Sequence, residues 1–174
     1  MGSTERPWRI TLTDGKTSAE SRVRLSQLMG PEHANHMGNV HGGVIMKMVD
    51  EAGALAAMRH AQSLCVTVTV DSMTFMEPIL VGYVVTVDAY LTFAGTTSME
   101  TRVEVTAENP LTGVKTHTNT AYVVYVALGE QGRPRRVPPL MATTPEEEAS
   151  MNDAQERQTY RKLQRAKESA RKRL

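Results

Sequence analysis

The stretch from Gly42 to Ala61 constrains the fold most strongly, because it is the longest central segment suited to a helix. Apolar residues recur in it at spacings of three and four, which is the repeat of one helix face. These residues are Val44, Ile45, Met48, Val49, Ala52, Leu55 and Ala56. Much of the remaining surface is small, with Gly53, Ala54 and Ala57. Other elements can therefore approach this helix closely from most sides, and we expect it to lie inside the fold.

Five segments have the period-two alternation of strands with two different faces. They are residues 20–29 before the helix and 65–75, 83–93, 98–107 and 114–128 after it. The connections between the last four carry turn residues such as Pro78, Gly95 and Gly113, and each is too short for a helical crossover. We therefore expect antiparallel neighbours and an α+β domain in which a curved sheet wraps around the central helix.

The flanking regions set the limits of this domain. Residues 1–19 mix Gly, Pro, Thr and Ser with charges, which predicts a poorly ordered leader before a domain at 20–130. Residues 131–145 read as a proline-rich linker and 146–174 as a charged C-terminal helix. The charge of this helix changes from acidic to basic along its length, which complements the helix dipole. We interpret the charges of the tail as a solvated helical face.

The charge balance and the cysteine count exclude several classes of protein. Twenty Lys and Arg residues against nineteen Asp and Glu residues leave a formal net charge of +1, so no overall field attracts nucleic acid or an anionic membrane. A single cysteine, Cys65, rules out an internal disulfide and leaves too few ligands for a His/Cys zinc cage. The first residues lack the apolar stretch of a signal peptide, and no apolar run approaches the roughly 18 residues of a membrane span. We expect a soluble, cytoplasmic protein that binds neither nucleic acid nor a membrane.

Asp50 is the first candidate for chemistry. On the helix it lies away from the centre of the apolar stripe, with Gly53 and Ala57 on its own side. A carboxylate among small residues is costly unless it is paired or used, and partial burial would make it a better general base than a surface Asp. The alternative is an exposed carboxylate on the wet side of the helix, where Glu51 is the expected partner of Lys47. The sequence leaves both interpretations open.

The loop before the helix holds the other candidates. Gly42 and Gly43 open the helix, where unpaired N–H groups and the positive end of the dipole can hold an anion or a polarised carbonyl oxygen. The same pair can instead serve only a tight turn and close packing. Asn35 is equally well explained by turn chemistry. Three histidines lie in this region without a motif such as H-E-x-x-H, so we expect no metal site.

A combination of motifs makes the chain recognisable. The motifs are Ala34-Asn35, Gly38-Asn39-Val40-His41-Gly42-Gly43, Ile45–Gly53, Arg59-His60, Val68–Phe75, Thr97–Glu100, Thr120-Ala121-Tyr122 and Pro138-Pro139-Leu140. Together they closely resemble the hotdog-fold acyl-CoA thioesterases of the cytosolic acyl-CoA hydrolase group. The resemblance covers roughly residues 20–165.

The resemblance implies a single hotdog domain that hydrolyses fatty acyl-CoA to free fatty acid and CoA. It implies that Asp50 acts as base or nucleophile and that Asn35 positions water or substrate, with the two residues coming from opposite subunits of a dimer. The amides of Gly42 and Gly43 would then polarise the thioester carbonyl. A chain with one hotdog unit must pair with another copy, and the family usually assembles three such dimers into a hexamer.

The CoA phosphates need cations or backbone amides. We expect them at Thr96, Thr97 and Ser98, where a turn leads into a strand, with Arg165 of the tail as a further candidate. Because CoA is part of the substrate, no separate cofactor is expected.

Two other functions remain open. Hotdog folds also host dehydratases, which commonly pair a histidine with a carboxylate; His41 could serve, although the match around Asp50 argues against it. A non-catalytic acyl-CoA-binding or sensing protein would bind its ligand without turnover and would tolerate Asp50→Asn. The absence of G-x-S-x-G disfavours a serine hydrolase, and Cys65, which opens a strand, is interpreted as a small core residue.

Overall fold

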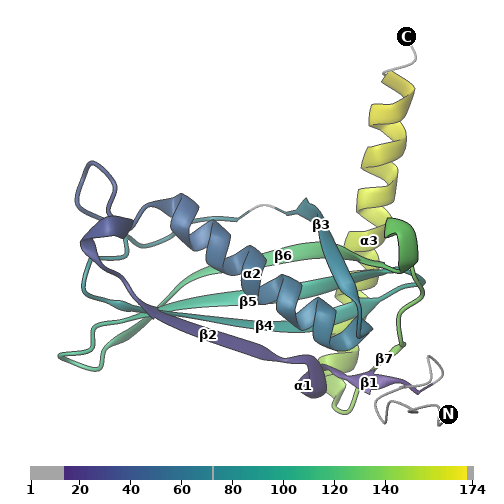
Figure 1. Ribbon diagram of the computed structural model, residues 1–174, viewed down its shortest axis with the longest axis horizontal. Coiled ribbons are helices and arrows are strands. Elements are labelled where there is room, and N and C mark those ends of the chain that lie inside the picture. The colour runs from purple at the N-terminus through teal and green to yellow at the C-terminus, as the bar shows by residue number, and fades with distance from the viewer. Residues whose placement is uncertain (1–13, 72, 172–174) are drawn as a thin grey trace, which may run out of the picture.

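A computed structural model of the protein describes residues 14–71 and 73–171 (Figure 1). In chain order the elements are β1 Lys16–Thr17, α1 Ser18–Ser21, β2 Val23–Leu28, η1 Pro31–His33, α2 Gly42–Ala61, β3 Leu64–Val70, β4 Val84–Ala94, β5 Ser98–Glu108, β6 Lys115–Leu128, η2 Glu130–Gly132, β7 Leu140–Met141 and α3 Pro145–Arg171. The predicted α+β architecture is confirmed: a five-stranded antiparallel sheet curls around α2, and α3 crosses the opposite face (Figure 1).

The strand order corrects one prediction. The hairpins β4–β5 and β5–β6 are antiparallel neighbours as expected, but the sheet order is β2-β4-β5-β6-β3, so β3 pairs with β6 and not with β4. The connection at residues 71–83 has no room for a helix, yet extended chain covers about 3.3 Å per residue. The three strand spacings between β3 and β4 amount to only about 14 Å. An extended segment of this length therefore carries the chain across the sheet.

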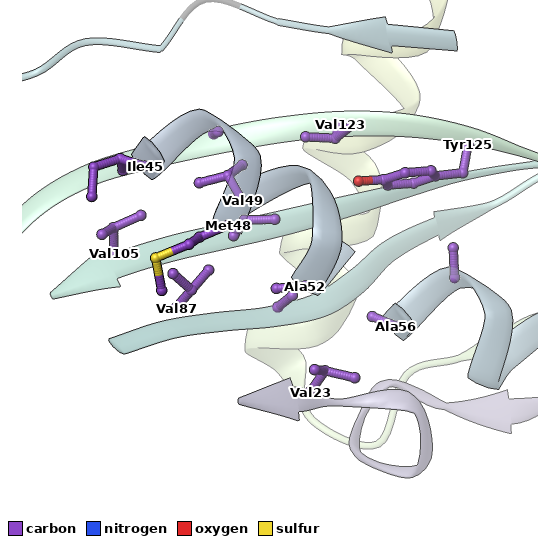
Figure 2. Close-up of a cluster of buried hydrophobic side chains, with 14 of the residues drawn as sticks. Val23, Ile45, Met48, Val49, Ala52, Ala56, Val87, Val105, Val123 and Tyr125 are labelled. Carbon is purple, nitrogen blue, oxygen red and sulfur yellow. The ribbon is translucent and has the colours of Figure 1, made fainter. Parts of the chain in front are cut away.

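The core lies between α2 and the inner face of the sheet (Figure 2). Ile45, Met48 and Val49 are buried there, as are the alanines at 52, 56 and 57, and they pack against valines of β2, β4, β5 and β6. The predicted apolar stripe is confirmed except at its edges, where Val44 is only partly buried and Leu55 is 43% exposed. At 100° per residue Leu55 lies well to one side of the line through Ile45, Ala52 and Ala56, so it points past the sheet.

The two flanking segments join the domain at the carboxyl end of α2. Residues 1–13 of the predicted leader lie outside the described residues, but Lys16–Thr17 form β1, which pairs with β7 in parallel. The Lys16 ammonium donates hydrogen bonds to the carbonyl oxygens of Arg59 and His60, both at 3.0 Å. These are carbonyls that the end of a helix leaves without intrahelical partners. The end of the segment predicted as a leader therefore belongs to the fold, as β1 and the start of α1, and the segment predicted as a linker contains β7.

The C-terminal helix corrects the interpretation of a solvated tail. Helix α3 has acidic residues in its first turn and a basic residue in its last, as predicted from the dipole. Arg161 is only 9% exposed, however, and pairs with the fully buried carboxylate of Glu100 on β5. Arg157 also pairs with Glu100, at 2.8 Å, and lies over the ring of Tyr122, 3.8 Å from its centroid. One face of the tail is therefore an ionic packing surface.

Candidate active site

Asp50 lies in the middle of α2, on the side of the helix that faces β3 and β6. Its Oδ1 atom accepts a hydrogen bond from the Thr67 hydroxyl at 2.7 Å and another from the Tyr125 hydroxyl at 3.3 Å. The Tyr125 hydroxyl also lies 2.9 Å from the main-chain oxygen of Asp50. The carboxylate is partly buried, so the interpretation as an ordinary surface residue does not fit it. That description fits Glu51, which is exposed and lies 3.5 Å from the Lys47 ammonium.

Thr67 and Tyr125 are the site residues that sequence analysis missed. Thr67 stands on β3 and Tyr125 on β6, and these two strands are paired with Thr67 opposite Tyr125. Both residues appear in the sequence as ordinary members of alternating strands. Only the pairing of β3 with β6, which places both hydroxyls beside α2, reveals that they meet at Asp50. Burial raises the pKa of the Tyr125 phenol above its usual range, and the negative charge of Asp50 raises it further.

Asn35 follows η1 in the loop before α2, where its side chain organises the backbone. Its Oδ1 accepts hydrogen bonds from the N–H groups of Met37 and Asn39, at 2.8 and 3.2 Å. The turn chemistry considered for this residue is therefore present. Asn35 and Gly42 also line one cavity of about 320 Å³, together with Phe75 of the connection at 71–83. Asn35 and the amino end of α2 therefore line the same cavity.

The amino end of α2 is partly occupied by its own N-cap. His41 is the N-cap residue, and its Nδ1 accepts a hydrogen bond from the N–H of Gly43 at 2.8 Å. An N-cap side chain commonly accepts from the second or third helical N–H, so the Gly43 donor is satisfied internally. Gly42 lines the cavity, and its N–H makes no hydrogen bond within residues 14–71 and 73–171, so this donor is available to a ligand.

The described chain does not bring Asp50 to Asn35. Asp50 follows Gly42 by eight positions on α2, which is about 12 Å along the axis at 1.5 Å per residue. Asp50 is also absent from the walls of the cavity that Asn35 lines. Within one copy, the candidate catalytic residues therefore lie apart, with Asn35 near the amino end of α2 and Asp50 in the middle of this helix.

The predicted CoA-binding residues form the β4–β5 turn. Their main-chain oxygens are used inside the fold, since Thr96 accepts from Val137, Thr97 from Ala127 and Ser98 from Gly95. The exposed Thr96 presents its side chain to solvent. Arg165 donates to the Thr69 hydroxyl at 2.7 Å, which holds it near the end of β3. Contact of these residues with CoA stays a prediction.

Comparison with known proteins decides the family. Residues 37–114 match the model of a protein family described as "Thioesterase superfamily". It is 34% identical over 143 residues to the "Uncharacterized acyl-CoA thioester hydrolase YkhA" of Bacillus subtilis, which covers 82% of this chain and 83% of that protein. The chain belongs to the hotdog-fold acyl-CoA thioesterases. This confirms the family and fold that the sequence motifs predicted.

Two further relatives of this member of the thioesterase family are a longer protein and a hexameric one. It is 37% identical over 151 residues to "Cytosolic acyl coenzyme A thioester hydrolase" of Mus musculus, but spans only 39% of the length of that protein. A structure described as an apo-hexameric acyl-CoA thioesterase is 36% identical, with a TM-score of 0.83 over 87% of this chain and 97% of that one.

The acyl-CoA hydrolase of Staphylococcus aureus adds information on residue positions. It was solved with butyryl coenzyme A and coenzyme A, and is 29% identical with a TM-score of 0.83 over 90% of this chain and 96% of that one. Its described alanine variants replace an asparagine, an aspartate and a threonine. Their positions are separated by 15 and 17 residues, as Asn35, Asp50 and Thr67 are in this family member.

The remaining polar candidates have structural partners in this thioesterase fold. His33 Nδ1 accepts from the N–H of Gly30 at 2.9 Å, and His41 caps α2. Among the described residues no group of three His, Cys, Asp or Glu side chains could hold a metal ion. Burial raises the pKa of the Cys65 thiol to about 11, so this cysteine stays protonated. No helix in the described ranges is long and apolar enough to cross a membrane.

Proposed function

We propose that this protein hydrolyses fatty acyl-CoA to a free fatty acid and CoA. The observation that carries the proposal is the Asp50 carboxylate, with Oδ1 held by the Thr67 and Tyr125 hydroxyls. Asn35, Asp50 and Thr67 also have the spacings of the residues replaced in the Staphylococcus aureus hydrolase. The family of the chain supports the thioester as the bond that is broken.

The chemistry needs three things from the protein: an activated nucleophile, a donor for the carbonyl oxygen and room for the leaving thiolate. As a base, Asp50 takes a proton from water while the water oxygen attacks the carbonyl carbon; as a nucleophile it attacks that carbon itself. Both routes use a free carboxylate oxygen. The Gly42 N–H stabilises the negative oxygen that forms, and Asn35 orients water or substrate beside it. The C–S bond then breaks and the CoA thiolate leaves; on the base route it takes up the proton that Asp50 removed from water. On the nucleophilic route the acyl group is left on Asp50 as a mixed anhydride, and water then hydrolyses this anhydride, which releases the fatty acid, restores the carboxylate and supplies the proton for the thiolate.

The complete site is built from two copies of the chain. Since Asp50 lies about 12 Å along α2 from Gly42, a thioester held by one amino end must meet the aspartate of another copy. The edge strand β3 supports this assembly, because Leu64, Val66, Val68 and Val70 are between 42% and 72% exposed along it. A symmetric pair formed through β3 and α2 would bury these side chains. The hexameric relative supports a trimer of such dimers.

The substrate and its setting follow from the same argument. We assign the CoA phosphates to the turn at Thr96, Thr97 and Ser98, whose amides and hydroxyls can donate to them. The reaction needs no cofactor besides the CoA that the substrate carries. The relatives named cytosolic support a cytoplasmic location. The dehydratase alternative gains no support, because the His41 ring already serves as the helix cap. The non-catalytic alternative predicts binding of acyl-CoA without turnover, which the measurement of thiol release below tests.

The first experiment measures thiol release from a panel of acyl-CoAs of different chain lengths by the wild-type protein and three variants. Asp50→Ala is expected to lower kcat about a thousandfold and Asn35→Ala about a hundredfold. Glu51→Ala is the control, because this neighbouring carboxylate is exposed and pairs only with Lys47 at 3.5 Å. Wild-type inactivity across the panel would overturn the enzymatic function. Activity that survives both site substitutions would refute the assigned residues.

The second experiment tests whether two copies share the site. In a dimer of one Asn35→Ala copy and one Asp50→Ala copy, one site loses both residues and the other keeps both. Co-refolding the two inactive variants in equal amounts is therefore expected to restore about a quarter of wild-type activity, since half the dimers are mixed and half their sites intact. No recovery in a mixture shown to contain mixed dimers would place the whole site in one copy.

A further inference from the structure

The Tyr125 hydroxyl is a buried polar group between α2 and the sheet, and the buried Thr101 hydroxyl lies beside the same position of the helix. The residue is fully buried, and Figure 2 shows its ring beside α2 with the oxygen directed toward the helix. Tyr122, three residues earlier on β6, faces the opposite side of the sheet, where Arg157 covers its ring. A phenylalanine would fill the apolar space equally well. The phenol oxygen therefore needs an explanation beyond packing.

Helix α2 leaves a space of matching size for this oxygen. A Cβ atom at Gly53 would lie 2.4 Å from the Tyr125 oxygen and 2.9 Å from the Thr101 hydroxyl oxygen, closer than real contacts allow. Gly53 follows Asp50 by three residues and so lies on the same side of the helix. The absence of a side chain at position 53 is what lets the phenol reach Asp50.

The hydroxyl makes the two oxygens of the Asp50 carboxylate unequal. Thr67 and Tyr125 both reach Oδ1, and Tyr125 also reaches the main-chain oxygen of the same residue. Within residues 14–71 and 73–171 no hydrogen bond reaches Oδ2. Because burial raises the pKa of the phenol, Tyr125 keeps its proton and remains a donor. The single phenol proton is shared between the main-chain oxygen at 2.9 Å and Oδ1 at 3.3 Å, and together with the Thr67 hydroxyl it favours the orientation in which Oδ1 lies toward β3 and β6.

We propose that Tyr125 is a positioning residue that fixes the Asp50 side chain with Oδ2 toward the thioester. The inference rests on the proposed function, since it assigns Tyr125 a role in that reaction through Asp50. Tyr125 itself touches no substrate, because it is fully buried. Its effect is on how often Asp50 holds the reactive orientation, so it acts on the chemical step and leaves the binding of acyl-CoA unchanged.

The test compares Tyr125→Phe with Tyr122→Phe, which removes a phenol from the same strand on the other face of the sheet. For Tyr125→Phe we expect kcat to fall about tenfold, with KM for the acyl-CoA changed less than twofold. Tyr122→Phe is expected to retain wild-type kcat and KM. Thermal unfolding and gel filtration of both variants check that fold and assembly are kept. A purely structural hydroxyl would lower the melting temperature without lowering kcat at saturating substrate.

A double-mutant cycle with Thr67→Val tests whether Tyr125 acts through the Oδ1 atom of Asp50. Thr67 is exposed in the single chain, and its hydroxyl and that of Tyr125 act on the same oxygen of Asp50. The loss of kcat in the double variant should therefore differ from the product of the two single losses. Equal wild-type and Tyr125→Phe kcat, or strictly multiplicative losses, would overturn the role of Tyr125 while Asp50→Ala still tests the proposed function. Wild-type inactivity would instead refute that function.

Discussion

On one face of the sheet α2 packs through alanine, valine, isoleucine and methionine, whereas on the other face α3 packs largely through arginines against a buried glutamate (Figure 1). The contact of α2 is non-directional, and its free energy follows the apolar area removed from water. The contact of α3 is directional, because each arginine must reach a particular carboxylate oxygen. The two helices thus respond to different kinds of substitution, although they share one sheet.

The ionic contact is organised around Glu100. Both of its oxygens are paired, with Arg157 and Thr92 on Oε1 and Arg161 on Oε2, and Arg161 also reaches Asp71 at 2.6 Å. Removing one member of such a buried set leaves the others desolvated without compensation. In the apolar contact of α2 no single group matters as much, because the loss of one buried methyl group lowers the free energy of unfolding by only about 1 kcal/mol.

The largest expected effect on stability is therefore at Glu100. Glu100→Gln should lower the free energy of unfolding by about 3 kcal/mol, because two arginines lose their charged partner in a buried setting. Urea denaturation measures this change. Glu104→Gln is the matched control, since Glu104 lies on the same strand and pairs with Arg102 in a half-exposed position at 2.7 Å. It should change stability by less than about 1 kcal/mol. Equal effects of the two substitutions would mean that the buried network is no stronger than a surface pair.

A smaller effect is expected where α2 meets Tyr125. Gly53→Ala gains about 1 kcal/mol in helix propensity, but forcing a methyl group into the phenol oxygen costs about 2 kcal/mol. We expect a net loss of about 1 kcal/mol in urea denaturation, with kcat lowered as the Tyr125 hydroxyl moves away from Asp50. Adding Tyr125→Phe removes the closest clashing atom and should restore part of the lost stability. If the double variant is less stable than Gly53→Ala alone, that close contact is not the cause.

The smallest expected effect is a pH dependence of stability that comes from His60 on α2. His60 is fully buried, with Ser21 Oγ 3.1 Å from Nδ1 and the Pro138 carbonyl oxygen 2.9 Å from Nε2. Burial lowers the pKa of His60 below its ordinary 6.5, and the Lys16 charge lowers it further. Below pH 6.5 the imidazole therefore binds a proton more readily in the unfolded chain than in the folded chain. The contribution of His60 to the free energy of unfolding is complete above pH 6.5 and is lost as the pH falls through the pKa of the folded state. The urea midpoint measured from pH 7.5 to 5 should show this fall in the wild type and a weaker one in His60→Gln. Identical slopes would assign the pH response to other groups.

Sequence alone predicted the parts of this fold that depend on local patterns. The apolar repeat of α2 and the turn residues at Gly95 and Gly113 act within a few positions, so the helix and the hairpins β4–β5 and β5–β6 were readable. The place of β3 was not, because an extended connection can lead to any strand within its reach. Thr67 and Tyr125 were missed for the same reason, since they meet Asp50 only after β3 pairs with β6.

The packing of α3 did leave a signal in the sequence. Arg157, Arg161 and Arg165 recur at intervals of four and so share one helix face, which a purely solvated helix does not require. The signal was incomplete because its partner, Glu100, stands in a strand of alternating polar and apolar residues. No local pattern shows that this polar position is buried. The cap at His41 is similar, as its position before two glycines was visible but its use of the Gly43 N–H was not.

The exposed strand β3 has a consequence for how the protein behaves at low concentration. Its outer edge offers main-chain hydrogen-bonding groups next to a row of apolar side chains, which is a template for adding strands from other chains. A single copy of the chain is therefore prone to aggregation along this edge. A second copy that covers β3 would prevent this, so the contact that we propose for the shared site would also keep the protein in solution.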